Sequence, residues 1–188
     1  MRARADELLL GEWACLGVVA QAPAHGYDVA RRLAPPGDVG RVWSLSRPLT
    51  YRALDQLGQR ELVVPVGEER GKAGGNRTIL APTRRGRSMV RRWLAEPVPH
   101  FRDVRGELLL KLVLCQITGT DRRPLLDAQR ALFAPMVDTL AASGRGARST
   151  SDPVDVWRFE SSSAALRFLD RLLDEPVGDG LVSSRRGR

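Results

Sequence analysis

Apolar residues recur at helical spacing in three stretches near the start of the chain. The first covers about 8–22, where hydrophobic positions lie three or four residues apart until Pro23 ends the pattern. A short stretch at 27–33 and a longer one at 47–60 follow, and Ser46 stands where an N-cap residue belongs. The pattern therefore predicts three helices separated by turns.

The next part of the chain has the pattern of a β-hairpin followed by a fourth helix. Residues 62–66 and 78–81 are rich in β-forming side chains, and a basic, glycine-rich turn at 71–76 separates them. Thr83 then precedes an amphipathic helical pattern that ends at Pro97. This order predicts two paired strands with a helix directly after them.

Long apolar patterns replace the basic residues beyond Pro97. Asp152 and Asp155 are alternative N-caps for the last of them, because both are acidic residues that precede its first apolar positions. The segments that we expect are an apolar segment at 108–117, a helix at 124–140, a loop at 141–151 and a helix ending at 173.

Three helices followed by a basic hairpin are typical of a winged helix-turn-helix. We therefore predict a mainly α protein with a small β-hairpin wing (α+β). Its third helix would enter the major groove of DNA, and its wing would reach the flanking backbone or the minor groove. The expected domains are a winged helix-turn-helix DNA-binding domain at 1–96, a helical dimerisation or effector region at 97–175 and a disordered tail at 176–188.

The distribution of charge favours a polyanionic partner. The formal net charge is +8 at pH 7, and Lys72 and Lys111 are the only lysines among the 30 basic residues. GC-rich coding would also raise the arginine content, but it would not concentrate the charge in one place. Between Arg41 and Glu96 there are 12 basic and 5 acidic residues, so this stretch carries most of the excess.

Other features exclude several classes of protein. No apolar stretch approaches the roughly 18 residues that cross a bilayer, and the N-terminus has no secretory pattern. Cys15 and Cys115 lie in apolar patterns without metal-ligand spacing, as expected of small core residues in a reducing cytoplasm. Because motifs for a nucleophilic serine, a nucleotide loop or a metal are missing, we expect neither an enzyme nor a cofactor nor a bound metal.

A series of short motifs marks the ends of the expected elements. They are His25-Gly26-Tyr27-Asp28, Trp43-Ser44-Leu45-Ser46, Tyr51 to Leu57, Leu62-Val63, Thr83-Arg84-Arg85-Gly86 and Leu109 to Leu112. In this order and spacing they resemble the PadR family of bacterial transcriptional regulators, over about residues 8–114. The resemblance implies a cytoplasmic homodimer that binds a pseudo-palindromic operator in double-stranded DNA. It further implies a repressor that a small hydrophobic or aromatic effector releases from that operator.

Two positions depart from the family pattern. Many members have a glycine-containing turn before the tyrosine of the third helix, where this chain has Arg47-Pro48-Leu49-Thr50. The surface that faces DNA is therefore specific to this chain. Glu61 stands where the family usually has a helix-ending glycine, and a left-handed conformation there would be strained.

Candidate DNA contacts lie at the start of the third helix and in the hairpin. Arginine can contact a guanine edge through two hydrogen bonds, and threonine can contact phosphate or a thymine methyl group. Cations at a glycine-rich tip can bind phosphate and release counterions. An ordinary solvated surface is the alternative, and Ser46 would serve equally as a plain N-cap. The expected contacts are Ser44, Ser46, Arg47, Thr50, Arg52, Lys72, Asn76 and Arg77.

Three arginines open the fourth helix, at Arg84, Arg85 and Arg87, where the helix dipole disfavours cations. An anionic partner and simple tolerance at the surface both explain them. We interpret His25 as stabilising a turn, and Tyr51 as a packing residue.

Four aromatic residues fall near the expected junction between the winged domain and the C-terminal helices. Trp13, Trp93, Phe101 and Trp157 could line a cleft that holds a flat effector. For each one taken alone, packing in the core or at a dimer interface is the alternative.

Two other classes of function stay open at this point. Winged helices also serve as protein-interaction modules, and a small-molecule-binding protein could lack specific DNA binding. The basic hairpin, Arg47 and Arg52 argue against both.

Overall fold

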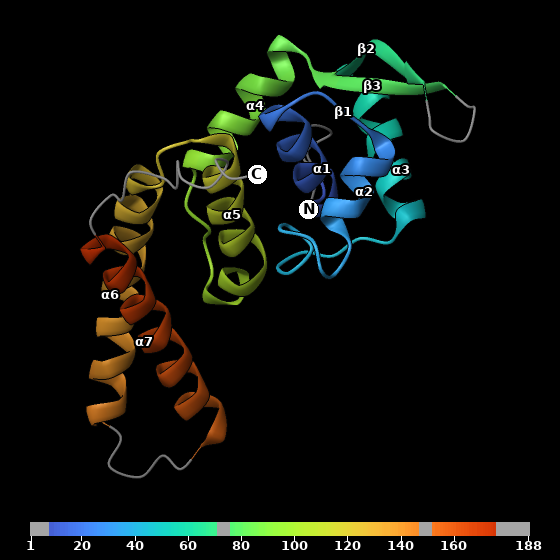
Figure 1. Cartoon of the computed structure of the whole chain (residues 1–188). Helices are drawn as coiled ribbons and strands as arrows, with labels where there is room; N and C mark the ends of the chain where they lie inside the picture. Colours follow the sequence, from blue (N-terminus) through green and yellow to red (C-terminus); the bar gives the residue numbers. More distant parts are fainter. Residues whose placement is uncertain (1–7, 71–75, 147–151, 176–188) are drawn as a thin grey trace, which may run out of the picture. The chain divides into compact units, whose positions relative to one another are not determined.

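The computed structural model of the chain describes residues 8–70, 76–146 and 152–175 (Figure 1). Its fold is mainly α with a small antiparallel sheet, as predicted. The elements are α1 (Leu10–Gln21), β1 (Ala24–His25), α2 (Gly26–Leu33), α3 (Arg47–Gln59), β2 (Val63–Arg70), β3 (Asn76–Pro82), α4 (Arg84–Ala95), a 3₁₀ turn (Phe101–Asp103), a π-helical turn (Val104–Leu108), α5 (Leu109–Thr118), α6 (Arg123–Gly146) and α7 (Pro153–Asp174).

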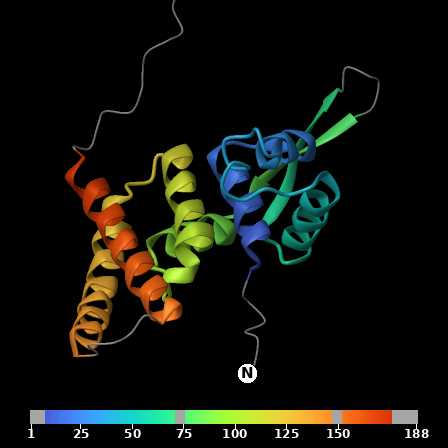
Figure 2. The same ribbon diagram turned by 90° about the horizontal axis from the view of Figure 1, so that it is seen from below.

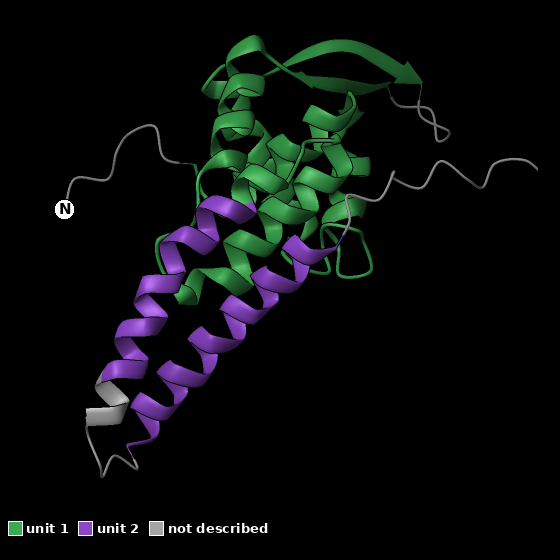
Figure 3. Ribbon diagram, turned by 90° about the vertical axis from the view of Figure 1, so that its left-hand side faces the viewer, with its two compact units in different colours: residues 1–125 green, residues 126–188 purple. Residues whose placement is uncertain are grey.

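The chain divides into two compact units, residues 1–125 and 126–188 (Figure 3). The sheet and helices α1 to α5 belong to the first unit, where α5 packs against α1. The expected boundary at residue 96 divides the chain by function, into a DNA-binding part and a dimerisation part. The compact units do not test this division, so it stays a prediction. The tail at 176–188 lies outside the described residues.

Helix α1 is the central helix of the first unit. Its residues from Glu12 to Val19 are all buried, and α2, α3, α4 and α5 pack against it. A helix that is apolar on nearly every side is stable only when neighbours surround it. Cys15 and Cys115 lie in this core, as predicted, and burial raises the pKa of their thiols to about 12 and about 11.

The hairpin is confirmed, and both of its strands are longer than predicted. β2 pairs antiparallel with β3 from Val63 opposite Pro82 to Arg70 opposite Asn76, with an irregularity in register between Pro65 and Gly67. β1, which the sequence pattern did not predict, adds a third strand on the other side of β3. Figures 1 and 2 show the two long strands projecting beyond the helices.

The turn between α3 and β2 contains the strain that the sequence predicts. Glu61 has a φ of 56°, in the left-handed region, and it is the only non-glycine residue with positive φ in the described part of the chain. The backbone N–H of Leu62 donates to the Leu57 carbonyl across the turn at 2.9 Å. The hydroxyl of Thr83, next to α4, donates to the Glu61 carbonyl at 2.9 Å, which ties the turn to the end of the hairpin.

The second unit consists of α7 and most of α6, which lie side by side (Figure 3). The Arg130 Nε atom of α6 is 2.6 Å from the Asp170 Oδ1 atom of α7. Asp152 is the N-cap of α7, because its carboxylate accepts the Val154 N–H at 2.9 Å. The loop expected from residue 141 is wrong for 141–146, since α6 continues through Pro135 to Gly146.

Candidate nucleic-acid interface

A hollow of about 770 Å³ lies where the start of α2, the start of α3 and strand β3 meet. We call it the α3–wing groove. Its lining residues are His25, Gly26, Tyr27, Arg47, Tyr51, Leu54, Asp55, Asn76, Arg77, Thr78 and Leu80. The groove thus contains the first residue of the predicted recognition helix and two of the predicted wing contacts.

Tyr27 is the central side chain of this groove. The guanidinium of Arg47, from α3, lies 4.8 Å from the centre of the Tyr27 ring. The guanidinium of Arg77, from β3, lies 5.3 Å from the same centre. Cations at such distances are attracted to an aromatic ring. Tyr27 therefore holds one arginine of the helix and one of the wing in a single cluster.

Tyr27 is positioned by a cap formed by the residue two places before it. The Nδ1 atom of His25 accepts the Asp28 N–H at 3.2 Å, which satisfies one free donor at the start of α2. The Nε2 atom lies 3.1 Å from the Asp28 carboxylate and 3.7 Å from that of Glu69 on β2. His25 therefore stabilises the turn, as we interpret from the sequence, and also connects α2 to the wing.

Gly26 allows α3 to approach the start of α2 closely. A Cβ atom added to Gly26 would lie 2.7 Å from the ring of Tyr51, which is closer than real contacts allow. Any larger residue here would displace the ring of Tyr51. The glycine therefore has a packing role in the groove.

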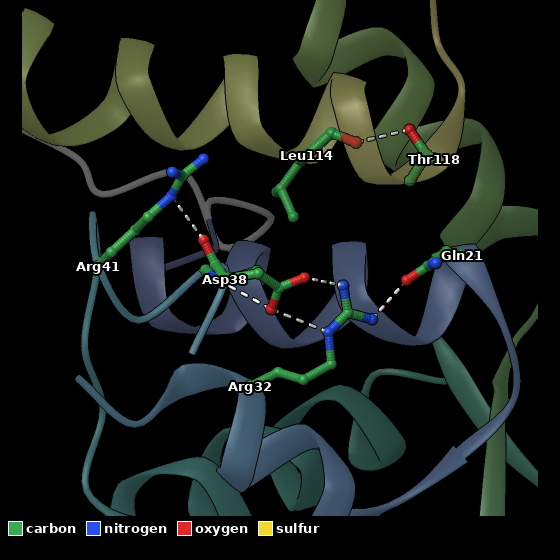
Figure 4. A network of polar contacts seen from close by, with 7 residues as sticks. Gln21, Arg32, Asp38, Arg41, Leu114 and Thr118 are labelled. Carbon is green, nitrogen blue, oxygen red and sulfur yellow. Dashed lines mark hydrogen bonds and ion pairs between the residues drawn. The ribbon is translucent and has the colours of Figure 1, made fainter. Parts of the chain in front are cut away.

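The segment between α2 and α3 is held by a network around Asp38 (Figure 4). Arg32 donates from Nε and Nη2 to the two carboxylate oxygens, at 3.1 and 2.6 Å, and from Nη1 to the Gln21 side chain. Arg41 Nε donates to the Asp38 carbonyl at 3.1 Å. The hydrogen bonds from Arg32 lower the pKa of the Asp38 carboxyl group. The network fixes the chain shortly before it enters α3.

Most of the residues predicted to contact DNA at α3 are exposed. Ser44, Ser46, Arg47 and Arg52 all face solvent. Ser46 occupies the N-cap position of α3, but its side chain makes no capping hydrogen bond. Its hydroxyl is therefore not used as a cap. The contact of Ser46 with DNA stays a prediction.

Thr50 corrects the sequence prediction. The residue is fully buried, and its hydroxyl donates to the Ser46 carbonyl at 3.1 Å. Thr50 lies on the same helical face as the buried residues Ala53, Leu54 and Leu57. It belongs to the core face of α3, and we withdraw it from the set of DNA contacts.

The wing residues are placed only in part. Asn76 is exposed and donates from Nδ2 to the Glu68 carboxylate at 2.8 Å, so its amide is engaged across the hairpin. Arg77 is half-buried against Tyr27. Lys72 lies outside the described residues.

The aromatic residues predicted to bind an effector do not share one environment. Trp13 and Trp93 stack on each other with ring centres 4.7 Å apart, and both are buried in the core. The ammonium of the buried Lys111 lies 4.7 Å from the centre of the Trp93 ring. These two tryptophans are packing residues, which is the alternative that the sequence left open. Phe101 is half-buried, and Trp157, on α7 in the second unit, is 71% exposed.

Tyr27 and Tyr51 are the groove residues whose role the sequence did not reveal. We read the first as part of an apolar helical stripe and the second as a packing residue. Both are partly exposed and line the groove. The sequence contains one signal for Tyr27, because this residue comes directly after the N-cap residue His25 and the close-packed Gly26.

Two further observations concern the described residues as a whole. No helix among them is long and apolar enough to cross a membrane. Nowhere in the described ranges do three or more His, Cys, Asp or Glu side chains gather in a way that could hold a metal ion.

Three helices followed by a β-hairpin that pairs with a short strand before α2 define a winged helix-turn-helix. No protein-family model and no curated protein matches the chain. Among solved structures, the chain is similar to Bacillus subtilis PadR in complex with operator DNA, with 19% identity and a TM-score of 0.44 over 86% of this chain and 92% of that one. It is also similar to Bacillus subtilis PadR in complex with p-coumaric acid (19% identity, TM-score 0.40, 90% and 97% covered). A third similar structure is the Vibrio cholerae virulence activator AphA (21% identity, TM-score 0.40, 88% and 92% covered).

Proposed function

We propose that this chain is a sequence-specific DNA-binding transcriptional regulator. The observation that carries the proposal is the α3–wing groove, in which Arg47 of α3 and Arg77 of β3 flank Tyr27. A recognition helix and a wing that present arginines into one hollow are suited to a duplex, whose phosphates and base edges both accept hydrogen bonds from guanidinium groups.

The start of α3 supports a role in reading bases. Arg47 and Arg52 are exposed in this part of α3, and the hydroxyl of Ser46 makes no capping hydrogen bond. The N-terminus of a helix carries partial positive charge and favours phosphate. We therefore expect Ser44 and Ser46 to contact backbone, Arg47 and Arg52 to reach base edges, and Arg77 to bind phosphate beside the major groove.

The second unit supports a homodimer. On α7, residues 152–160 are exposed throughout, and large apolar side chains are among them. Among the described residues of the unit, the exposed large hydrophobic side chains are Leu132, Met136, Val154, Val156, Trp157 and Phe159. Exposed large apolar side chains are a feature of surfaces that bind another protein. A two-fold dimer would present two copies of α3 to a pseudo-palindrome with half-sites about one helical turn apart.

Repression and its release by an effector form the finer part of the proposal. The stacked pair Trp13 and Trp93 fills its own space, so a flat effector would have to contact Phe101 or Trp157 instead. Bound effector would favour a dimer geometry in which the two recognition helices no longer match the operator. A panel of planar hydrophobic compounds that quenches tryptophan fluorescence and releases DNA supports this part. If the fluorescence stays unchanged with every compound, the proposal of an effector is wrong and only the proposal of DNA binding remains.

The experiment that tests the proposal measures binding of the purified protein to the DNA upstream of its own coding sequence. A scrambled duplex of the same composition is the competitor, at two salt concentrations. We expect preference for the upstream duplex and weaker binding at higher salt, because counterions released from phosphate drive the association. Arg47→Ala should cost about 1–3 kcal/mol and relax the preference, if Arg47 reads a base.

Arg105→Ala is the matched control. It removes the same charge from an exposed position of the first unit that lines neither the α3–wing groove nor the hollow on α4 described below. Equal affinity for both duplexes would contradict sequence-specific regulation. No binding to either duplex would favour a protein-interaction module or a small-molecule-binding protein instead.

A further inference from the structure

Helix α4 carries a dense set of arginines on one side. Its buried residues are Gly86, Val90, Trp93 and Leu94, which pack toward the core. The remaining surface is rich in arginine and contains no acidic residue between Arg84 and Ala95. We define the α4 basic face as the exposed residues Arg84, Arg85, Arg87, Arg91 and Arg92.

Little within the described residues neutralises this charge. Arg92 Nε lies 3.9 Å from the Glu96 carboxylate, at a position where both side chains are largely exposed. Arg84, Arg87 and Arg91 form no ion pair in the described part of the chain. Arg84 and Arg87 also stand in the first turn, where the helix dipole opposes cations. The fold therefore gains no ion pair from Arg84, Arg87 and Arg91 within the described residues.

The α4 basic face is separate from the α3–wing groove. A hollow of about 560 Å³ lies on it, lined by Arg84, Arg85, Ser88, Met89 and Arg92, and it shares no residue with the groove. Arg85 Nη1 donates to the carbonyl of Arg60, directly after the last residue of α3, at 3.2 Å. Because α3 has 13 residues and Arg47 is its first, about 20 Å of helix lies between Arg47 and this contact.

The chemistry of the α4 basic face fits phosphate better than a protein surface. Protein interfaces rely on large apolar anchors at their centre. None of the exposed large hydrophobic residues in the described ranges lies on α4. The hollow is lined by three arginines, Ser88 and Met89, and guanidinium groups are donors of the kind that bind the DNA backbone without regard to sequence.

We propose that the α4 basic face binds the phosphate backbone of a second segment of duplex DNA, so that one protein particle bridges two segments. The inference rests on the proposed function in one respect, namely that duplex DNA is the partner of the groove. DNA that contacts Arg47 at the start of α3 lies at one end of this helix, whereas Arg85 of the α4 basic face lies at the other end, about 20 Å away. The second segment is therefore a separate duplex or a distant part of the same molecule.

A bridging assay with two random-sequence 20-base-pair duplexes tests this inference. One duplex is immobilised and loaded with protein, and capture of the second, fluorescent duplex is measured as a function of salt. Wild-type protein should capture it. The variant R84A/R87A/R91A should still bind the immobilised duplex, but capture should fall about tenfold or more, with a salt slope smaller by about 2–3, because three phosphate contacts are lost.

The matched control is R102A/R105A/R167A, which removes the same charge from exposed positions outside both hollows and should capture like the wild type. The α4 variant should unfold no more easily than the wild type, since the removed charges oppose the helix dipole. Unchanged capture by the α4 variant would overturn the inference. Equal loss of binding to the immobilised duplex and of capture of the second duplex would also overturn it. The α4 basic face would then take part in binding the first duplex.

The two proposals fail in distinguishable ways. If R47A/R77A binds the upstream duplex as tightly as the wild type, the groove is not the DNA site and the proposed function fails. A loss of capture that is confined to the α4 variant would still show that the α4 basic face binds DNA. If the α4 variant loses binding to polyglutamate but not to the second duplex, the α4 basic face binds an acidic protein and the inference is wrong.

Discussion

The two compact units bury their helices to very different extents. In the first unit, α1 is buried from Glu12 to Val19 by four neighbouring helices. In the second unit, residues 152–160 of the α7 region are exposed at every position, including Trp157. The first unit therefore contains a large core of its own, whereas the second leaves large apolar side chains exposed at the start of α7.

The largest expected effect comes from removing core volume in the first unit. Leu16 is fully buried in α1, so Leu16→Ala should lower the free energy of unfolding by about 2–5 kcal/mol. Leu132→Ala on α6 is the matched control, because that leucine is 38% exposed. Denaturant unfolding of both variants at low protein concentration measures the contrast. Similar losses in the two variants would contradict the difference between the units.

The next effect concerns association rather than folding. Trp157→Ala should weaken the proposed dimer by about 2 kcal/mol, because tryptophans at an interface often dominate its energy. The unfolding of the monomer should change little, since the side chain is 71% exposed. Sedimentation over a range of concentrations measures the dissociation constant, with the neighbouring exposed Glu160→Ala as control. A wild-type chain that stays monomeric at every concentration would rule out the dimer.

Much of the first unit follows from its sequence pattern, because strong local signals agree with one another there. A proline stands two residues after the end of α1, α2 and α4, and the apolar spacing of α1, α3 and α4 matches the buried faces. β1 could not be predicted, because two residues show no periodicity and Ala24–His25 become a strand only by pairing with β3. Thr50 could have been placed correctly, since it stands three, four and seven residues before buried apolar positions.

The candidate site was less accessible to prediction than the fold. The arginines of the groove follow from residue type and position, but their arrangement around Tyr27 depends on tertiary packing between α2, α3 and β3. In the second unit, the end of a helix could not be predicted from the sequence. Its glycine- and serine-containing segment after residue 140 predicts a loop, yet α6 continues to Gly146, because propensity alone is a weak determinant of where a helix ends.

A smaller effect, of opposite sign, is expected at the turn that leads into the wing. Glu61 adopts the left-handed conformation, which is costly for a residue with a Cβ atom. Glu61→Gly should therefore raise the free energy of unfolding by about 1 kcal/mol. Glu61→Ala, which keeps the Cβ atom, should show no such gain. A thermal midpoint that falls in the glycine variant would show that the glutamate side chain contributes more than its strain costs.

The smallest effect comes from the network that holds the chain before α3. The hydrogen bonds from Arg32 lower the pKa of Asp38 from its ordinary value of 3.8, so the charged form stabilises the fold. This contribution is fully present above that value and is lost as the pH falls through the lowered pKa of the folded state. Because the Asp38 side chain is 45% exposed, Asp38→Asn should cost only about 0.5 kcal/mol at neutral pH. Urea unfolding of wild type and variant from pH 7 to pH 2 should show two curves that converge below about pH 4. A gap that stays constant over this range would assign the loss to geometry and not to the charge on Asp38.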